Sequence, residues 1–231
     1  MRLELICLDA DDTLWHNMRH FAEAEDSFIA MLRPFADANI ARVSLEACES
    51  RNLKHYGYGA KGFTLSMIET ALELGGPALP ASVIRDIVEA GRRLLAHPVE
   101  LLSGIEETLH ALANRGRLAL VTKGDLLHQE AKLAASGLGE LFSAVEIVSD
   151  KNKGTFERLF RRHDVRPEQA VMAGDSLRSD VLPALDAGAW AAFVPHAIQW
   201  THEQAEEPSN HHRYRRLTSL AELPAWIDDI A

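Results

Sequence analysis

The sequence predicts an α/β protein in which a parallel sheet carries helices on both faces and a helical segment is inserted after the first strand. Three observations indicate this fold. A short apolar segment at 3–8 opens the chain, and residues 16–97 then show only helical spacing of apolar side chains. From residue 98 onward, short apolar segments alternate with amphipathic ones, as in a sheet whose strands are joined by crossover helices.

The first strand is expected at Leu3–Leu8, because this short apolar segment ends at an acidic cluster. Four more strands are expected at 117–121, 144–148, 170–173 and 190–194. Helical segments at 126–136, 154–163 and 179–187 separate them. Residues 1–15 and 98–231 are therefore expected to form one Rossmann-like core domain.

Residues 16–97 are expected to form a separate helical domain. Its apolar residues recur on one helical face, for example at Phe21, Phe28 and Phe35. Breaks are expected near Pro34, at the glycine-rich stretch 57–62 and at "GGPALP". An insertion at this point would lie over the carboxyl end of the first strand, where ligands bind in such sheets.

Composition limits the classes of partner. The chain has 231 residues, of which 47% are hydrophobic and 25% charged, and its net charge is −10. An acidic chain of this kind argues against nucleic acid and anionic membranes as partners. The opening residues lack the apolar core of a signal peptide, and no apolar run reaches the ~18 residues of a membrane span. A cytoplasmic protein is therefore expected.

Polar side chains follow four of the predicted strands. "DADDT" brings Asp9 and Asp11 to the same side of an extended backbone, where two close carboxylates need a cation or a proton between them. The other strand ends supply Thr122, Lys151 or Lys153 in "SDKNK", and Asp175 and Asp180 in "GDSLRSD". Such a cluster could bind a hard cation through oxygen ligands and a phosphate through the lysine and the hydroxyl.

This ordered set of residues resembles the four motifs of the haloacid dehalogenase superfamily, and residues 16–97 resemble the helical cap of its subfamily I members. The resemblance covers the whole chain. It implies magnesium-dependent hydrolysis of a small phosphomonoester, a phosphorylated metabolite, through an aspartyl-phosphate intermediate.

The resemblance also implies a role for each residue. Asp9 would be the nucleophile, and Asp11 the general acid that later acts as the base. Mg²⁺ would be held by the Asp9 carboxylate, the Asp11 main-chain carbonyl and Asp175. Asp12 occupies a position where many relatives carry glycine.

Thr122 and a lysine would bind the phosphoryl oxygens. Lys151 is preferred over Lys153, because related sequences place this lysine about five residues before an aromatic residue, here Phe156. Asp180 would support that lysine or a metal-bound water.

The stretch "GYGAKG" at 57–62 matches the glycine pattern of dinucleotide-binding folds. No predicted strand precedes it, and no acidic residue lies about 20 residues further on, so we do not interpret it as a nucleotide site. We expect a loop of the cap in which Tyr58 and Lys61 contact the leaving group of the substrate.

The sequence leaves alternatives to a phosphatase. A phosphomutase of the same superfamily would return the phosphoryl group to a sugar. A non-catalytic protein would only bind a phosphorylated metabolite or act as a receiver-like switch on the same sheet, although the intact acids and the inserted cap argue against both. A dehalogenase is disfavoured, because those relatives lack the second carboxylate that Asp11 supplies here.

Overall fold

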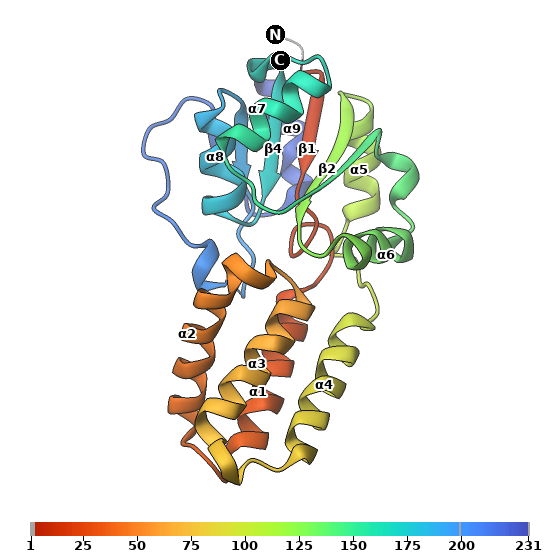
Figure 1. Ribbon diagram of the computed structural model, residues 1–231. Coiled ribbons are helices and arrows are strands. Elements are labelled where there is room, and N and C mark those ends of the chain that lie inside the picture. The colour runs from red at the N-terminus through yellow and green to blue at the C-terminus, as the bar shows by residue number, and fades with distance from the viewer. Residues whose placement is uncertain (1–2, 199, 231) are drawn as a thin grey trace. The chain divides into compact units, whose positions relative to one another are not determined.

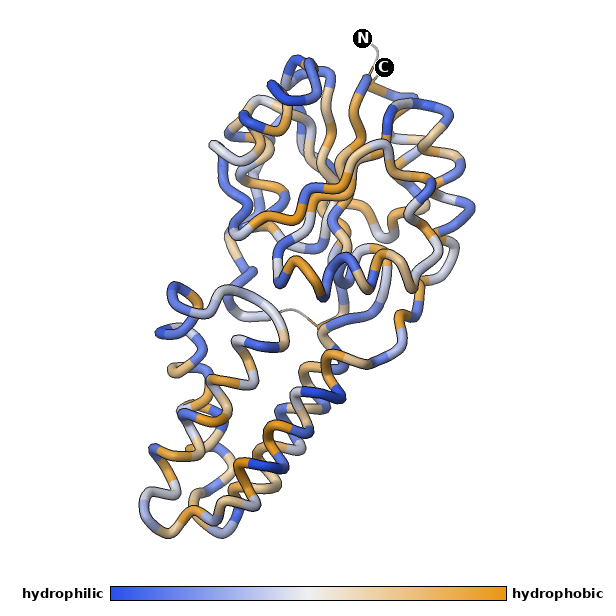
Figure 2. Tube along the Cα trace, turned by 45° about the vertical axis from the view of Figure 1, so that its right-hand side comes forward, coloured by the Kyte–Doolittle hydropathy of each residue, from blue (hydrophilic) through white to orange (hydrophobic). Residues whose placement is uncertain are grey.

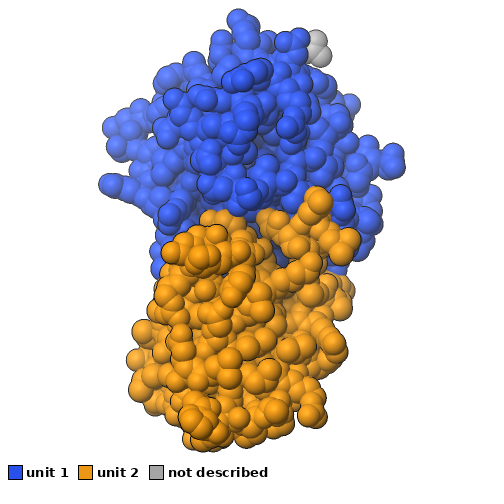
Figure 3. Space-filling model, viewed as in Figure 1, with its two compact units in different colours: residues 1–18, 99–123, 129–231 blue, residues 19–98, 124–128 orange. Residues whose placement is uncertain are grey.

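The computed structural model describes residues 3–198 and 200–230. They form two compact units (Figure 3). The sheet unit comprises the described residues of 1–18, 99–123 and 129–231, and the helical unit comprises 19–98 and 124–128. The turn at 124–128 thus groups with the helical unit, although it interrupts the sequence of the sheet unit.

The sheet unit contains six parallel strands in the order β3-β2-β1-β4-β5-β6 (Figure 1). The strands are β1 Leu5–Leu8, β2 Arg117–Lys123, β3 Ala144–Val148, β4 Ala170–Gly174, β5 Trp190–Phe193 and β6 Tyr214–Arg216. The predicted fold class, a parallel sheet with helices on both faces, is confirmed. The strands β1 and β4 lie side by side in the middle of the sheet, with Leu8 opposite Ala173.

Alternate residues of β1 enter two different cores, because successive side chains of a strand point to opposite faces. Ile6 and Leu8 pack on one face with the helices α5 and α9, whereas Leu5 and Cys7 pack on the other face with α7 and α8. These helices, with α6, are α5 Ile105–Ala113, α6 Leu126–Ser136, α7 Lys153–Arg162, α8 Leu182–Asp186 and α9 Leu223–Ile230. The strand is apolar on both faces for this reason. Figure 2 colours the Cα trace by residue hydropathy, and apolar residues recur through the sheet unit.

The helical unit consists of α1 Met18–Leu32, α2 Ala38–Tyr56, α3 Ala60–Gly75 and α4 Ala81–Leu95, with Met18 itself assigned to the sheet unit. Its own apolar core includes Phe28, Leu45 and Met67. The helices end where the sequence predicts breaks. Gly57 and Gly76, which end α2 and α3, have φ angles of 70° and 50°, a left-handed conformation that glycine adopts without strain.

The turn at 124–128 is joined to the helical unit by an ion pair. The Lys61 Nζ donates to Asp125 Oδ1 at 2.9 Å, and the Asp125 carboxylate also accepts from the His128 main-chain N–H at 3.1 Å. The described part of the chain contains no helix long and apolar enough to cross a bilayer.

We predict that Gly91→Ala destabilises the helical unit. A Cβ on Gly91 of α4 would lie 2.2 Å from the Thr64 Oγ1 of α3, so the two helices would have to move apart. Overpacking of this kind costs about 1–3 kcal/mol, which urea unfolding would measure. The control is Gly139→Ala, because a Cβ there meets no atom within 4 Å. Equal unfolding midpoints for the two variants would contradict this close helix contact.

Candidate functional site

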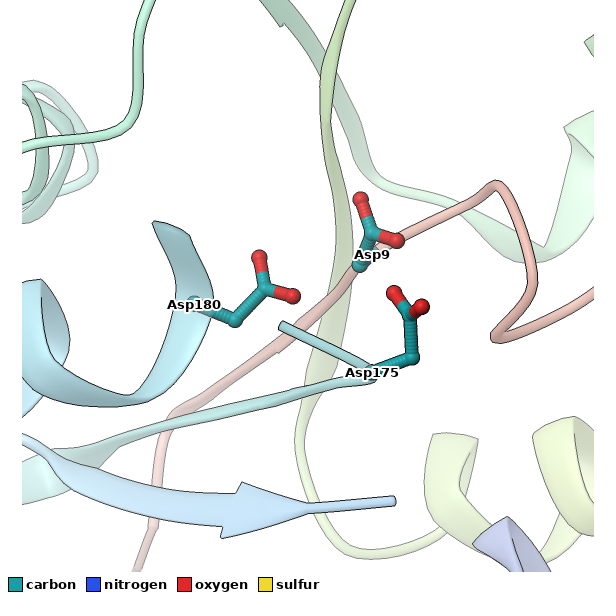
Figure 4. A group of neighbouring side chains, drawn as sticks. All are labelled: Asp9, Asp175 and Asp180. Carbon is teal, nitrogen blue, oxygen red and sulfur yellow. The ribbon is translucent and has the colours of Figure 1, made fainter. Parts of the chain in front are cut away.

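Three carboxylates meet at the carboxyl ends of the central strands. Asp9 follows β1, Asp175 follows β4, and Asp180 lies in the helical turn Leu177–Val181 just beyond it. One oxygen from each lies within 4.8 Å of the others, and Figure 4 shows the three side chains converging. The main-chain N–H of Asp9 donates to the Ala173 carbonyl at 3.0 Å, which holds the Asp9 main chain against β4.

Gly174 permits this close approach. A Cβ at this position would lie 2.2 Å from Asp180 Oδ2 and 2.9 Å from the Asp9 Cβ. Only a residue without a side chain leaves room for both acids, so the glycine at the end of β4 is part of the site. The sequence analysis did not single out this requirement.

Lys151 supplies the positive charge of the cluster. Its Nζ donates to Asp9 Oδ1 and, at 2.7 Å, to Asp180 Oδ1, and the lysine is buried. Lys153, the other lysine considered, has a side chain that is 59% exposed and pairs with Glu157 at 3.6 Å. Of the two, the structure brings Lys151 to the carboxylates.

Three acids and one ammonium leave this cluster short of positive charge. Burial raises the pKa of Asp9 to about 7, although Lys151 opposes the shift. Burial, together with the charge of Asp9, also raises the pKa of Asp175 well above its usual range. A further cation would relieve the repulsion between the carboxylates of Asp9, Asp175 and Asp180. Hard carboxylate oxygens are the ligands that Mg²⁺ prefers.

Asp11 lies in a separate network. Its carboxylate accepts hydrogen bonds from the Lys132 ammonium at 2.6 and 2.8 Å, from Trp15 Nε1 at 2.7 Å and from Gln129 Nε2 at 3.2 Å. Burial raises the pKa of Asp11, but these donors, with Lys132 foremost, outweigh burial and lower it. Lys132 and Gln129 are site residues that the sequence analysis missed.

Thr122 stands near the end of β2, the strand that pairs with β1 on the side opposite β4. Its hydroxyl accepts from Gln129 Nε2 at 2.7 Å and is buried. Gln129 therefore connects Thr122 to Asp11, since the same amide nitrogen reaches both residues.

Asp12 has a structural role. Its φ angle is 60°, the left-handed region in which glycine, asparagine and aspartate are enriched. Its carboxylate accepts from the main-chain N–H groups of Asn17 and Met18 at 2.9 Å, where α1 begins. This conformation gives a physical reason for glycine at the same position of related sequences.

The glycine-rich stretch joins two helices. α2 ends at Tyr56 and α3 begins at Ala60, so no strand precedes the pattern and it is not a dinucleotide-binding turn. Tyr58 and Lys61 belong to the helical unit, where the Lys61 ammonium pairs with Asp125. Their predicted contact with a substrate stays a prediction.

A second, partly buried ion pair lies beside the cluster. The Lys123 Nζ donates to Ser179 Oγ at 2.7 Å and to the carboxylate of Glu203, which also accepts from Ser176 and Ser179. Burial raises the pKa of Glu203, but the ammonium of Lys123 and the hydrogen bonds from Ser176 and Ser179 together outweigh burial and lower it. This network fastens the turn Thr201–Glu203 to the segment that carries Asp180.

Comparisons with known proteins agree on one family. Residues 3–188 match the family model of the haloacid dehalogenase-like hydrolases. A phosphoserine phosphatase of Thermus thermophilus is 30% identical over 230 residues, which cover 85% of this chain and 90% of that protein. A glyceraldehyde 3-phosphate phosphatase of Methanopyrus kandleri is 27% identical over 194 residues, covering 80% of this chain and 81% of that protein.

A solved structure is also similar. A haloacid dehalogenase-like family hydrolase from Xanthomonas campestris has a TM-score of 0.90 and 41% sequence identity to this chain. The match covers 99% of this chain and 91% of that one.

We predict that Lys151→Met and Lys153→Met differ sharply in stability. Removing Lys151 takes away the ammonium that pairs with buried Asp9 and Asp180, and breaking a buried pair in this way costs about 3–5 kcal/mol of unfolding free energy. The same substitution at exposed Lys153 should change it by less than about 0.5 kcal/mol. Urea unfolding in EDTA measures both values. A Lys151→Met protein as stable as Lys153→Met would show that the ammonium does not hold the cluster together.

Proposed function

The chain belongs to the haloacid dehalogenase-like hydrolase family, and on that premise we propose that it is a magnesium-dependent phosphatase acting on a small phosphomonoester. One observation carries the proposal. Asp9 is buried at a strand end, paired with Lys151, and shares a site with the carboxylates of Asp175 and Asp180. The names of the similar phosphatases, which concern phosphoserine and glyceraldehyde 3-phosphate, support a small phosphorylated metabolite as the substrate.

The proposed reaction has two steps. An Asp9 oxygen attacks phosphorus, and the bond between phosphorus and the leaving oxygen breaks. Asp11, whose pKa Lys132 lowers, must first take up a proton from solvent and then gives it to the leaving oxygen. Asp11 then takes a proton from the water that attacks the aspartyl-phosphate, so inorganic phosphate leaves and the Asp9 carboxylate is restored. Lys151 and the Thr122 hydroxyl would bind the phosphoryl oxygens. Both residues must then lie near the same phosphoryl group, at the carboxyl ends of the strands.

The donor set fits Mg²⁺. Asp9 and Asp175 offer carboxylate oxygens, and the Asp11 main-chain carbonyl would complete the set. The pKa values of both acids are raised by burial first and by neighbouring carboxylates second, and a cation would offset both effects. Asp180 is engaged by Lys151, which favours a supporting role for this acid. When bound, Mg²⁺ would offset negative charge on the transferred phosphoryl group.

The helical unit is the proposed cap. Residues 16–97 would form this domain, and residues 1–15 and 98–231 the hydrolase core, which we propose to be a cytoplasmic enzyme. The support is that 19–98 have their own apolar core. Tyr58 and Lys61 would contact the leaving group, because they lie at the glycine-rich break between α2 and α3.

We predict that Asp9→Asn abolishes phosphate release from 4-nitrophenyl phosphate in the presence of Mg²⁺. Loss of a nucleophile should lower kcat by at least about 10³-fold, because an amide oxygen cannot form the phosphoenzyme. EDTA should stop the wild type as well. The control is Asp229→Asn in α9, an exposed acid of the sheet unit.

Three results would count against the proposal. Turnover that survives Asp9→Asn would identify another nucleophile, and turnover that persists in EDTA would exclude the metal requirement. A folded wild type that hydrolyses no phosphomonoester would favour a phosphomutase or a non-catalytic binding protein.

We predict that Lys61→Ala changes substrate preference more than basal turnover. A hydrogen bond from an ammonium to a charged substrate group is worth about 1.5–3 kcal/mol, so kcat/KM on the preferred metabolite should fall about tenfold or more. Turnover of 4-nitrophenyl phosphate, which lacks that group, should stay within about threefold. Lys54→Ala, at an exposed lysine of α2, is the control. Equal losses on both substrates would contradict a contact with the leaving group.

A further inference from the structure

The carboxylate of Asp11 is held on both oxygens. Oδ1 accepts from Trp15 Nε1 at 2.7 Å and from Lys132 Nζ at 2.6 Å. Oδ2 accepts from Gln129 Nε2 at 3.2 Å and from the same ammonium at 2.8 Å. Two donors on each oxygen leave the side chain little rotational freedom.

Lys132 is unusually placed for a lysine. It lies on α6, is only 3% exposed, and its ammonium also donates to Asn17 Oδ1 at 3.2 Å. Gln129 lies three residues earlier on the same helix, so both side chains project from one face toward Asp11. These contacts lie within the sheet unit and join α6 to the turn after β1.

Stability gives little reason to bury this charge. Removing an ammonium from water is costly, and apolar residues of similar volume often replace a buried ion pair without loss of stability. A fixed orientation of Asp11 is what the ion pair provides in addition to packing, because each carboxylate oxygen receives a charge-assisted hydrogen bond.

We propose that Lys132 is a positioning residue that acts through Asp11, aiming the oxygen that exchanges protons with the leaving group and with water. This inference rests on the proposed phosphatase function. The role of Lys132 follows from its geometry. Its ammonium makes two short contacts to the Asp11 carboxylate, and the lysine is buried on the helix α6.

The two chemical steps depend differently on the orientation of the Asp11 carboxylate. An alkoxide leaving group needs the proton from Asp11, whereas 4-nitrophenolate is stable enough to leave without one. Hydrolysis of the aspartyl-phosphate is the same step for every substrate and always needs Asp11 to take a proton from water. Loss of Lys132 should therefore slow phosphoenzyme formation only for substrates with an alkoxide leaving group. It should slow phosphoenzyme hydrolysis for every substrate.

The test is Lys132→Met, with Lys153→Met as the matched control at an exposed position. On the best alkyl phosphomonoester of a panel, kcat/KM should fall about 10–100-fold, a part of the 10²–10⁴-fold typical of acid–base catalysis. On 4-nitrophenyl phosphate, kcat/KM should stay within about threefold while kcat falls. Rapid mixing should then show a burst of one 4-nitrophenolate per active site, because the phosphoenzyme accumulates.

Equal losses of kcat/KM on both substrates without a burst would overturn the proposal and leave Lys132 a structural residue. Unchanged kinetics would overturn it as well.

If Lys132→Met does not fold, Trp15→Phe removes one donor to the same carboxylate. It should lower kcat/KM on the alkyl phosphomonoester more than on 4-nitrophenyl phosphate, to a smaller degree than Lys132→Met. A wild type without Asp9-dependent turnover would defeat the proposed function, and this inference with it. An active wild type whose Lys132 variant loses both activities equally would defeat this inference alone.

Discussion

The buried ammonium of Lys151, held between the carboxylates of Asp9 and Asp180, is the interaction on which the strand-end site depends. It joins the loop after β3 to residues that follow β1 and β4, although β2 separates β3 from β1 in the sheet. Without it, two buried acids and the partly exposed Asp175 would lie at close range, and their mutual repulsion would oppose the packing of the two central strands. Gly174 makes the arrangement sterically feasible by leaving the space that Asp180 occupies.

The two acids of the first motif pair with different cations. The chain turns at residues 12–14, just after Asp11, and a bridge pairs Asp11 with Trp15 across this turn. Asp9 is paired with Lys151 and Asp11 with Lys132, so each carboxylate has its own cation. In the proposed reaction this separation gives Asp9 a role as nucleophile and Asp11 a role as acid and base.

Local chemistry made the fold and the family predictable from the sequence. Apolar segments define buried strands, proline and glycine define the helix ends, and the polar residues just after the strands gather at one edge. Lys132, Gln129 and Glu203 were not predicted, because their partners are remote in sequence. Lys132 and Asp11 are 121 residues apart, and a lysine on an amphipathic helix is ordinarily solvated. The spacing to Phe156 favours Lys151 over Lys153, and in the structure Lys151 lies in the loop after β3 whereas Lys153 begins α7.

The central claim is that Asp9 carries the phosphoryl group during turnover. The most direct measurement is peptide mass spectrometry of the wild-type protein quenched with acid while it hydrolyses a phosphomonoester in the presence of Mg²⁺. We expect a phosphate on the peptide that contains Asp9, localised to that residue and absent when substrate is omitted. A phosphate on a different residue of a fully active protein would contradict it.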